Sequence, residues 1–529
     1  MDKNTMNLGK ISCLKKILGY ITIPISTHDS RLAQHTPKIT DNDFNYDPLS
    51  TSIAQEYINE LSKDKNTSGA TIIKDGPAAF VIRAAFARMA TKTIDLQTYI
   101  YSNDFSSMVL IGELKNAADR GVKVRILIDD YGTKTDIADV LVLNQHPNIE
   151  VKIFNAVKNR SRLFYYPQIL MDFNRLNSRM HNKLFIVDNI ALVTGGRNIG
   201  RDYFFPETAS NFSDTDVLFL GDIAKHATAS FNEYWNYHLA VPASVFPKAK
   251  SKHAKQKFEH KLDNILRKSA REVHRYNTII SFTQREFKNK NFDFCWGHGQ
   301  FLADPPNKVE MSMRQKETYL SKIIIAVNKL WRQTTHSAYV SAAYFVPGPG
   351  GIDTMLKEEK SGVHVTIVTN SLSSTNAPTV YAKWEKYRTK LLQGGIDIYE
   401  FMLGEKNPRK NVHDRERKRS CFSVMHSKTI VFDDHVSWIG SFNLDPRSAY
   451  YNTENVAIFE STEFAKKLRN LIMSDAKDSW KLSYENNHTV WTGKHDPKES
   501  LTTHHKCPDT TFFRRLIKMF AKIIPEKFV

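Results

Sequence analysis

The sequence predicts an α/β protein built from two tandem halves that repeat each other. Two observations support this fold class. Each half alternates predicted strands with helices, and each contains one copy of the same polar motif, at residues 181–198 and 426–443. The chain of 529 residues is long enough for two core-sized domains, and its hydrophobic content of 41% is that of a globular protein.

The first half covers residues 71–240. Near its start a strand, a helix and a second strand follow one another, and a right-handed crossover makes those strands parallel. A further strand, the hairpin of the first motif, a last strand and a closing helix complete this half. The predicted elements are a helix at 78–90, strands at 93–101 and 122–128 around a helix at 108–120, strands at 149–154, 184–187, 190–193 and 217–220, and a helix at 223–237.

The first motif, MHNKLFIVDNIALVTGGRNIG, predicts a β-hairpin with a polar entrance. His181 and Lys183 are two residues apart, so on an extended strand their side chains lie on the same face. Asp188 begins the turn to the return strand, and the Gly-Gly pair before Asn198 lets the backbone approach another group closely. His181, Lys183 and Asn198 are therefore candidate catalytic residues.

The second motif, MHSKTIVFDDHVSWIGSFN, repeats the first. His426, Lys428 and Asp433 have the spacing of the first histidine, lysine and aspartate, and Asn443 lies seventeen residues after its histidine, as in the first motif. One such match arises by chance about 0.1 times per chain, but two with the same downstream pattern are much harder to dismiss. The alternative is a pair of ordinary hairpins with buried histidines, which gives no reason for a lysine beside the histidine twice. His426, Lys428 and Asn443 complete the candidate set.

The second half covers residues 319–505 and repeats the order of the first. Residues 241–318, between the halves, are basic and lack a clean apolar stripe, which predicts an inter-domain insert with some helix. A strongly basic loop at 406–420 precedes the second motif. The other predicted elements of this half are helices at 319–332, 352–360 and 384–393, and strands at 338–345, 364–370 and 396–401.

The two ends of the chain have features of membrane-binding segments. Residues 1–70 form a leader in which lysines precede a short apolar stretch, so a signal peptide, a membrane anchor and a disordered leader are all open interpretations. Residues 506–529 predict a basic amphipathic helix, with Arg514, Lys518 and Lys522 opposite a stripe of bulky apolar residues. Such a helix suits either a membrane interface or a position against its own domain.

The composition restricts the partners and the compartment. A net charge of +18 favours polyanionic partners, namely phosphates, an anionic membrane surface or nucleic acid. The four cysteines are scattered, so neither a zinc site nor a disulfide framework is expected, and a reducing compartment is the simpler interpretation. No stretch approaches the roughly eighteen uninterrupted apolar residues of a conventional transmembrane helix.

The chemistry of a phosphodiester explains why two such motifs would act together. Two lysines and two asparagines around one phosphate balance its charge during attack. One neutral histidine attacks phosphorus, and a second, protonated histidine gives its proton to the leaving alcohol, so no metal or other cofactor is needed. Acidic residues that begin the next strand, Asp216 and Glu454, are expected to orient the imidazoles, whereas Asp188 and Asp433 are expected to support the hairpins.

The paired motifs resemble the two HKD motifs of the phospholipase D superfamily. The flanking sequence at 94–133, 344–378 and 440–459 is similar to that of bacterial cardiolipin synthases, in particular their C-type members. The resemblance implies two phospholipase D-type α/β/α halves with the active site at their interface. It also implies a phosphohistidine intermediate on His181, with His426 as the general acid, and transfer of the phosphatidyl group to water or to a lipid alcohol.

Three classes of function are open at this point. The first is a phospholipid phosphodiesterase or phosphatidyltransferase, the second a nucleic-acid phosphodiesterase on the same fold, and the third a membrane-binding protein without activity. Loss of a motif residue would indicate the inactive class, and no motif residue is lost here. The amphipathic tail and the flanking sequence favour a phospholipid substrate over nucleic acid. We expect peripheral association with an anionic membrane, on the cytoplasmic side of a bacterial inner membrane or after secretion, and no obligate protein partner.

Overall fold

The computed structural model describes residues 37–132, 138–157, 172–205, 210–246, 251–403, 422–495 and 499–526. Two predictions lie outside these residues: the lysines and apolar stretch of the leader, and the basic loop at 406–420. Within the described ranges, no helix has both the length and the apolar character needed to cross a membrane.

The first half begins after two short lead-in helices, α3 (Ser52–Glu56) and α4 (Ile58–Leu61). Its strands are β1 (Thr67–Ile73), β2 (Thr93–Ile100), β3 (Lys123–Gly132), β4 (Ile149–Phe154), β5 (Leu184–Val187), β6 (Ala191–Gly195), β7 (Ser210–Ser213), β8 (Asp216–Gly221) and β9 (Ala240–Pro242). Its helices are α5 (Gly76–Met89), α6 (Phe105–Asp119), α7 (Ala138–Leu143), α9 (Phe173–Asn177), α10 (Arg201–Phe204) and α11 (Asp222–Trp235). Aspartates cap α5 and α6, where the carboxylates of Asp75 and Asp104 accept backbone N–H groups of the first turn.

Two long helices, α12 (Lys252–Lys268) and α13 (Ala270–Lys288), precede the second half. The strands that follow are β10 (Cys295–Ala303), β11 (Ser337–Ala342), β12 (His364–Asn370), β13 (Asp397–Phe401), β14 (Phe422–Met425), β15 (Lys428–Phe432), β16 (Val436–Gly440), β17 (Asn455–Glu460), β18 (Ser479–Glu485), β19 (His488–Gly493) and β20 (Thr502–His504). The helices are α14 (Met313–Thr318), α15 (Lys322–Gln333), α16 (Gly348–Lys360), α17 (Pro378–Gln393), α18 (Thr462–Lys477) and α19 (Phe512–Ala521).

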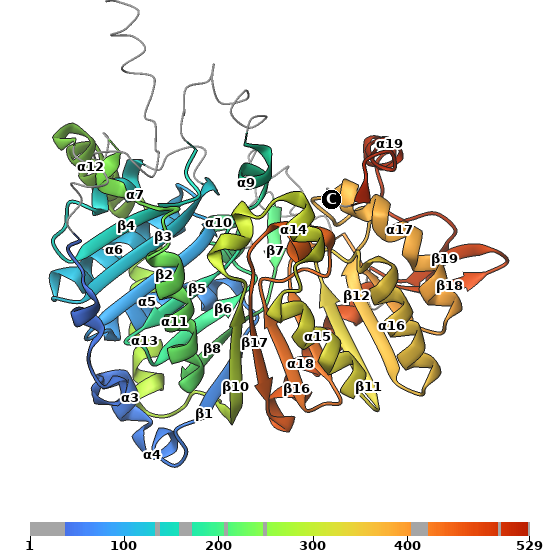
Figure 1. The fold of residues 1–529 in the computed structure, drawn as a ribbon, viewed down its shortest axis with the longest axis horizontal. Coiled ribbons are helices and arrows are strands. Elements are labelled where there is room, and N and C mark those ends of the chain that lie inside the picture. The colour runs from blue at the N-terminus through green and yellow to red at the C-terminus, as the bar shows by residue number, and fades with distance from the viewer. Residues whose placement is uncertain are drawn as a thin grey trace, which may run out of the picture.

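An 18-stranded sheet runs through both halves, with helices on its faces (Figure 1). The pairings give the order β9-β4-β3-β2-β5-β6-β8-β1 in the first half. In the second half they give β10-β17-β16-β15-β11-β12-β13-β18-β19-β20. In both halves three parallel strands adjoin an antiparallel run that contains the motif hairpin, so the prediction of two repeated α/β halves is confirmed.

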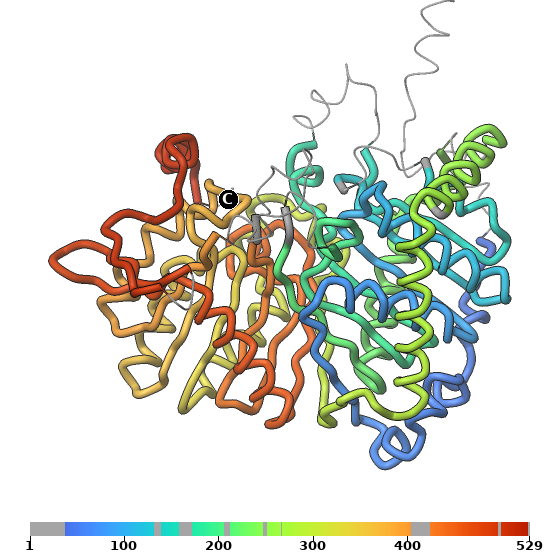
Figure 2. Tube along the Cα trace, turned by 180° about the vertical axis from the view of Figure 1, so that it is seen from behind, coloured from blue at the N-terminus to red at the C-terminus, as the bar shows by residue number. Residues whose placement is uncertain are grey.

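Strand β10 joins the halves, and this corrects the predicted insert over residues 241–318. β1 pairs with β8 and with β10, and β10 pairs in turn with β17. Since β17 is the counterpart of β8, β10 is the counterpart of β1, and the second half begins near Cys295. The sequence CWGHGQFLA shows no clean alternation because this strand is only partly buried, so its pattern did not predict a strand. Helices α12 and α13 stand apart from the repeat and cross the back of the first half (Figure 2).

Three apolar cores hold these layers together. One lies between the sheet and helices α5, α6 and α13 of the first half, and another between the sheet and α15, α16 and α17 of the second. The third spans both halves beneath α11 and α18, where the rings of Phe219 and Phe459 meet with centroids 5.6 Å apart. The halves therefore share a buried core, and the site between them is built on a packed interface.

Candidate active site

The two histidine motifs lie where the halves meet, and each histidine is held by the backbone of the opposite half. The N–H of His181 donates to the carbonyl of Thr453 at 2.9 Å, and the N–H of His426 donates to the carbonyl of Ser213 at 2.7 Å. Strand β7 of the first half also pairs in parallel with β14, which leads into His426. The position of each histidine thus depends on both halves.

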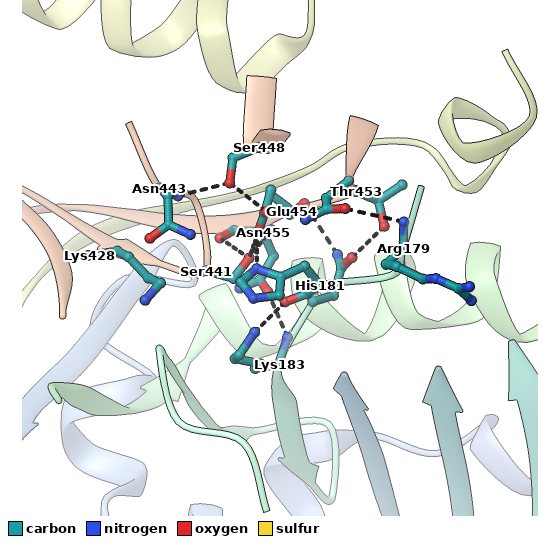
Figure 3. A network of polar contacts seen from close by, with 12 residues as sticks. Arg179, His181, Lys183, Lys428, Ser441, Asn443, Ser448, Thr453, Glu454 and Asn455 are labelled. Atoms are coloured by element: carbon teal, nitrogen blue, oxygen red, sulfur yellow. Dashed lines mark hydrogen bonds and ion pairs between the residues drawn. The ribbon is translucent and has the colours of Figure 1, made fainter. Parts of the chain in front are cut away.

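Each imidazole is oriented by a carboxylate from the other half. Nδ1 of His181 lies 2.8 Å from Oε2 of Glu454, and Nδ1 of His426 lies 2.7 Å from Oδ2 of Asp214 (Figure 3 shows the first of these pairs). All four side chains are buried. Because the carboxylate accepts the Nδ1–H of a neutral ring, Nε2 carries the lone pair and is the nitrogen available for chemistry.

The prediction that Asp216 orients a histidine is wrong. Its Oδ2 accepts a hydrogen bond from Arg83 at 2.9 Å and lies 3.7 Å from Nη1 of Arg197. Asp216 is fully buried, and these two guanidinium groups compensate its charge. Asp216 therefore stabilises the interior of the first half. The residue that orients His426 is Asp214.

The register of the sheet explains this correction. In the first half, Asp216 pairs with the first glycine of the Gly-Gly pair, and in the second half Val456 pairs with the equivalent glycine. The residue two positions earlier in each half is Asp214 or Glu454, so these two are the structural equivalents. The sequence offered two aspartates, two residues apart, where the chain leads into a strand, and spacing alone did not separate them.

The residue next to each orienting carboxylate also differs between the halves: Asp214 lies against a glycine, and Glu454 lies against a serine. A Cβ on Gly196 would lie only 2.4 Å from Oδ1 of Asp214, so the glycine leaves room for this carboxylate. At the equivalent position the Ser441 hydroxyl donates to Glu454, and Ser448 Oγ donates to the other oxygen of Glu454 at 2.8 Å. Both serines were missed in the sequence, although Ser441 occupies the position of the second glycine.

Lys183 and Lys428 are buried beside their histidines. Nζ of Lys183 donates to the carbonyl of His181 at 2.7 Å, and Nζ of Lys428 donates to the carbonyl of His426. Burial lowers the pKa of Lys183 to about 7 and the pKa of Lys428 to about 8, although nearby carboxylates act in the opposite direction. A bound phosphate anion would raise both pKa values, so the lysines carry their full charge when such a group is present.

The two asparagines are placed differently. Asn198 is held by the protein, because its Oδ1 accepts the N–H of Ile100 at 3.2 Å and its Nδ2 donates to the Tyr203 hydroxyl at 2.8 Å. Asn443 lies beside Lys428 (Figure 3), and its Oδ1 is buried without a hydrogen-bond partner among the described residues. Of the two side-chain amides, that of Asn443 therefore has an oxygen whose hydrogen bond is not supplied by the described residues.

The two histidine–carboxylate pairs differ in the direction in which the pKa of the carboxylate is shifted. Burial and then the neighbouring lysines lower the pKa of His181 well below its ordinary value, and burial and a lysine lower the pKa of His426 to about 4. Burial acts to raise the pKa of Asp214, but its contact with His426 lowers it below the ordinary carboxyl value. Burial raises the pKa of Glu454. Asp214 is thus the more readily ionised carboxylate and favours a positive charge on its histidine.

Asp188 and Asp433 lie at the turns of the two motif hairpins. Each adopts a left-handed backbone conformation, with φ of 53° and 50°. The Asp188 carboxylate accepts the N–H groups of residues 91–93 at 2.7–2.9 Å, and Asp433 accepts those of residues 335–337 at 2.8–2.9 Å. These bonds tie each hairpin to the start of its neighbouring strand, as expected for supporting residues.

Aromatic rings and a buried ion pair complete the surroundings and were not predicted. The ring of Tyr99 meets that of His181 edge-on at 5.1 Å, and Phe212 lies 5.1 Å from His426. Asp304 accepts the N–H of Glu454 at 3.1 Å and an ammonium hydrogen bond from Lys308 at 2.8 Å. Within the described part of the chain, no three His, Cys, Asp or Glu side chains are grouped so as to hold a metal ion.

Comparison with known proteins identifies relatives of this chain. The family model described as cardiolipin synthase, PLD-like domain, matches residues 84–235 and 328–476. An uncharacterized protein of Helicobacter pylori is 40% identical over 500 residues, which cover 94% of this chain and 96% of that protein. Cardiolipin synthase C of Escherichia coli is 31% identical over 458 residues, which cover 85% of this chain and 94% of that protein.

A solved structure shares the fold. The crystal structure of phosphatidylserine synthase from Haemophilus influenzae matches with a TM-score of 0.52 and 12% identity, covering 81% of this chain and 92% of that one. The two segments matched by the family model are the halves that carry the histidine motifs. The predicted resemblance is thereby confirmed, and the chain belongs to the cardiolipin synthase-like family of the phospholipase D superfamily.

Proposed function

We propose that this protein is a phospholipid phosphodiesterase and phosphatidyltransferase of the phospholipase D type. It cleaves the head-group phosphodiester and passes the phosphatidyl group to a lipid alcohol, forming cardiolipin, or to water, forming phosphatidic acid. One observation carries the proposal: two buried imidazoles, each with Nδ1 on a carboxylate of the other half, stand beside two buried lysines. The name of the Escherichia coli relative supports a lipid as the substrate.

His181 is the nucleophile in this mechanism. Its lowered pKa keeps the ring neutral, and Glu454 holds the tautomer that leaves the lone pair on Nε2. Nε2 attacks phosphorus, the bond from phosphorus to the head-group oxygen breaks, and a phosphatidyl-histidine forms. The charges of Lys183 and Lys428 stabilise the phosphoryl oxygens as the attack proceeds.

His426 supplies the proton that the leaving alcohol needs. The phosphodiester anion brings negative charge next to this ring, which raises its pKa from about 4, and ionised Asp214 acts in the same direction. After the head group leaves, neutral His426 accepts a proton from the incoming hydroxyl group. The oxygen of that hydroxyl then displaces His181 from phosphorus, and both histidines return to their starting states.

Defined substrates test the proposal. Purified protein is incubated with detergent-dispersed phosphatidylglycerol and phosphatidylethanolamine, and products are identified by mass spectrometry. We expect cardiolipin or phosphatidic acid from the wild-type chain and neither from His181→Ala. Cleavage of DNA without turnover of any of these lipids would overturn the lipid assignment in favour of a nucleic-acid phosphodiesterase.

We also propose that the protein acts as a peripheral membrane protein on an anionic surface, on the cytoplasmic side of a bacterial inner membrane. The net charge of +18 supports attraction to anionic lipids. The proposed substrate resides in a bilayer, so a protein that acts on it must reach the interface. Cell fractionation with salt washes tests this, because a protein held only by charge is released as the ionic strength rises.

A further inference from the structure

Helix α19 turns an apolar face toward solvent. Phe512 and Phe513, at its start, are 74% and 73% exposed, and Ile523, just beyond its end, is 80% exposed. The remaining members of this face are Ile517, Met519, Phe520 and Ile524, which are all at least 40% exposed. Exposed apolar side chains gathered on one short helix mark an interaction surface rather than ordinary surface scatter.

Most of the basic side of the same helix faces its own protein, and Arg515 is exposed. Nη1 of Arg514 donates to the carbonyls of Leu372 and Thr375 at 2.9 and 2.6 Å. Glu385 of α17 binds both lysines of the helix, Lys518 at 2.7 Å and Lys522 at 2.9 Å. The two interpretations of this segment therefore both contribute: the helix packs on its own domain through its cations, and its apolar stripe is left outside.

The helix stands at what we call the catalytic edge of the second half, the side on which β12 ends and the second histidine motif lies. It rests on the loop after β12. Asn370, the last residue of β12, donates through Nδ2 to the carbonyl of Met425 at 2.7 Å and accepts the N–H of Met425 at 3.1 Å. Met425 immediately precedes the catalytic His426. Figures 1 and 2 both show α19 projecting from the body of the second half at this edge.

We propose that the apolar face of α19 inserts into the interfacial region of a lipid bilayer and turns the catalytic edge toward the membrane. This inference rests on the proposed function for its link to catalysis. Helix α19 projects from the body of the protein and exposes phenylalanine and isoleucine side chains. Such a helix can insert into a bilayer, because lipid chains rearrange around it and no complementary groove is needed. The overall positive charge brings the same protein to an anionic surface, so the bilayer is the occupant with complementary chemistry on both counts.

The internal pairing of the cations has a measurable consequence. Because Arg514, Lys518 and Lys522 are paired with their own protein, the contribution of α19 should come mainly from apolar burial, with a smaller part from the exposed Arg515. Binding should then have two separable parts. The general charge of the protein gives a part that salt removes, and α19 gives a part that persists in salt and on uncharged lipid.

A matched pair of variants tests the inference. The first carries Phe512→Ser, Phe513→Ser and Ile523→Ser, and the control carries Leu320→Ser and Leu501→Ser, which replace leucines that are 60% and 68% exposed elsewhere. Both are co-sedimented with phosphatidylcholine vesicles in high salt. We expect the first variant to bind more weakly by a factor of at least roughly ten, since three inserted side chains are lost. The control should bind like the wild-type chain.

Activity measurements separate this inference from the proposed function. On a short-chain phospholipid dispersed below its micelle concentration, the α19 variant should turn over substrate at the wild-type rate. On vesicles its rate should fall by the same factor by which its vesicle binding is weakened. If the protein turns over no lipid at all, the proposed function fails, and the vesicle partition still decides the inference. Sedimentation of the α19 variant equal to that of the wild-type chain overturns it. So does light scattering that shows a wild-type dimer and a monomeric variant with unchanged vesicle binding, because the face would then join two copies.

Discussion

Replacing Asp214 by asparagine removes the charge that supports His426 while keeping the size of the side chain. Its Oδ2 lies 2.7 Å from Nδ1 of His426, and both groups are buried. An amide favours the protonated imidazole far less than a carboxylate does, so Asp214→Asn should lower the pKa of His426 further below its value of about 4. The protonated acid then becomes rarer at neutral pH, and proton donation to the leaving alcohol becomes slower.

The size of the effect follows from the role of a positioned general acid. Such a group contributes about 10²- to 10⁴-fold to the rate, so kcat of Asp214→Asn should fall by roughly that factor. The fold itself should be little affected, because the His426 that remains is neutral and leaves no buried charge without a partner. Circular dichroism and the midpoint of thermal unfolding check that the variant is folded.

Asp216→Asn is the matched control, two residues further along the chain at the start of β8. Asp216 carries the charge that pairs with Arg83 at 2.9 Å, so its replacement leaves a buried guanidinium uncompensated. Breaking a buried ion pair in this way costs about 3–5 kcal/mol of the free energy of unfolding. We therefore expect Asp216→Asn to unfold at lower denaturant concentration, with kcat of the folded protein within a few-fold of the wild-type value.

The assay uses two phospholipid substrates that differ in their leaving group. Choline needs a proton as it leaves, whereas p-nitrophenol leaves as a stable anion, so the loss in Asp214→Asn should be large with the first and small with the second. Equal losses with both substrates would contradict the role of Asp214 in proton donation. A catalytic loss in Asp216→Asn, without a loss of stability, would contradict the sheet register on which the assignment rests.

Three further predictions concern the remaining parts of the site. With the p-nitrophenyl substrate and rapid quenching, His426→Ala should still form a phosphatidyl-histidine adduct and His181→Ala should not, and an adduct mapped to His426 would reverse the two roles while leaving a two-histidine mechanism. The pKa values of Lys183 and Lys428 are lowered to about 7 and about 8, so these lysines of the free protein lose their protons as the pH rises through that range. We therefore expect kcat/KM to fall between about pH 7 and pH 8, and a rise would contradict the role of the lysines in binding phosphate. Lys308→Met strands the buried charge of Asp304 and should cost about 3–5 kcal/mol of stability in urea unfolding, whereas the double variant with Asp304→Asn should recover most of it.

The sequence was sufficient for features that depend on local spacing. The two-residue period of a strand places the lysine of each motif beside its histidine, and the repetition of the motif predicts two equivalent halves. The pairing of Asp214 with His426 connects residues 212 positions apart across the junction of the halves. No local pattern contains that information, so the choice between Asp214 and Asp216 had to come from the sheet register.

The same limit applies to β10 and to α19. β10 mixes glycine, histidine and glutamine with apolar residues because much of it is partly exposed, and its place in the sheet is decided by partners distant in the chain. For α19, the helical period correctly separates a cationic from an apolar side. Which side faces the protein depends on Glu385 of α17, more than a hundred residues away, whose carboxylate binds both lysines.

The exchange of carboxylates between the halves explains how two nearly identical motifs would perform unequal tasks. Each histidine takes its orienting group from the opposite half, so the pair exists only when the halves are packed together. The exchanged groups are not the same: one half offers a glutamate whose oxygens are bonded by two serines, and the other an aspartate seated against a glycine. The pKa of the first carboxylate is raised by burial, and that of the second is lowered by its histidine. In the proposed mechanism, the duplicated fold would thereby place a neutral nucleophile and a chargeable acid on two sides of one phosphate, which a strictly symmetric pair would not distinguish.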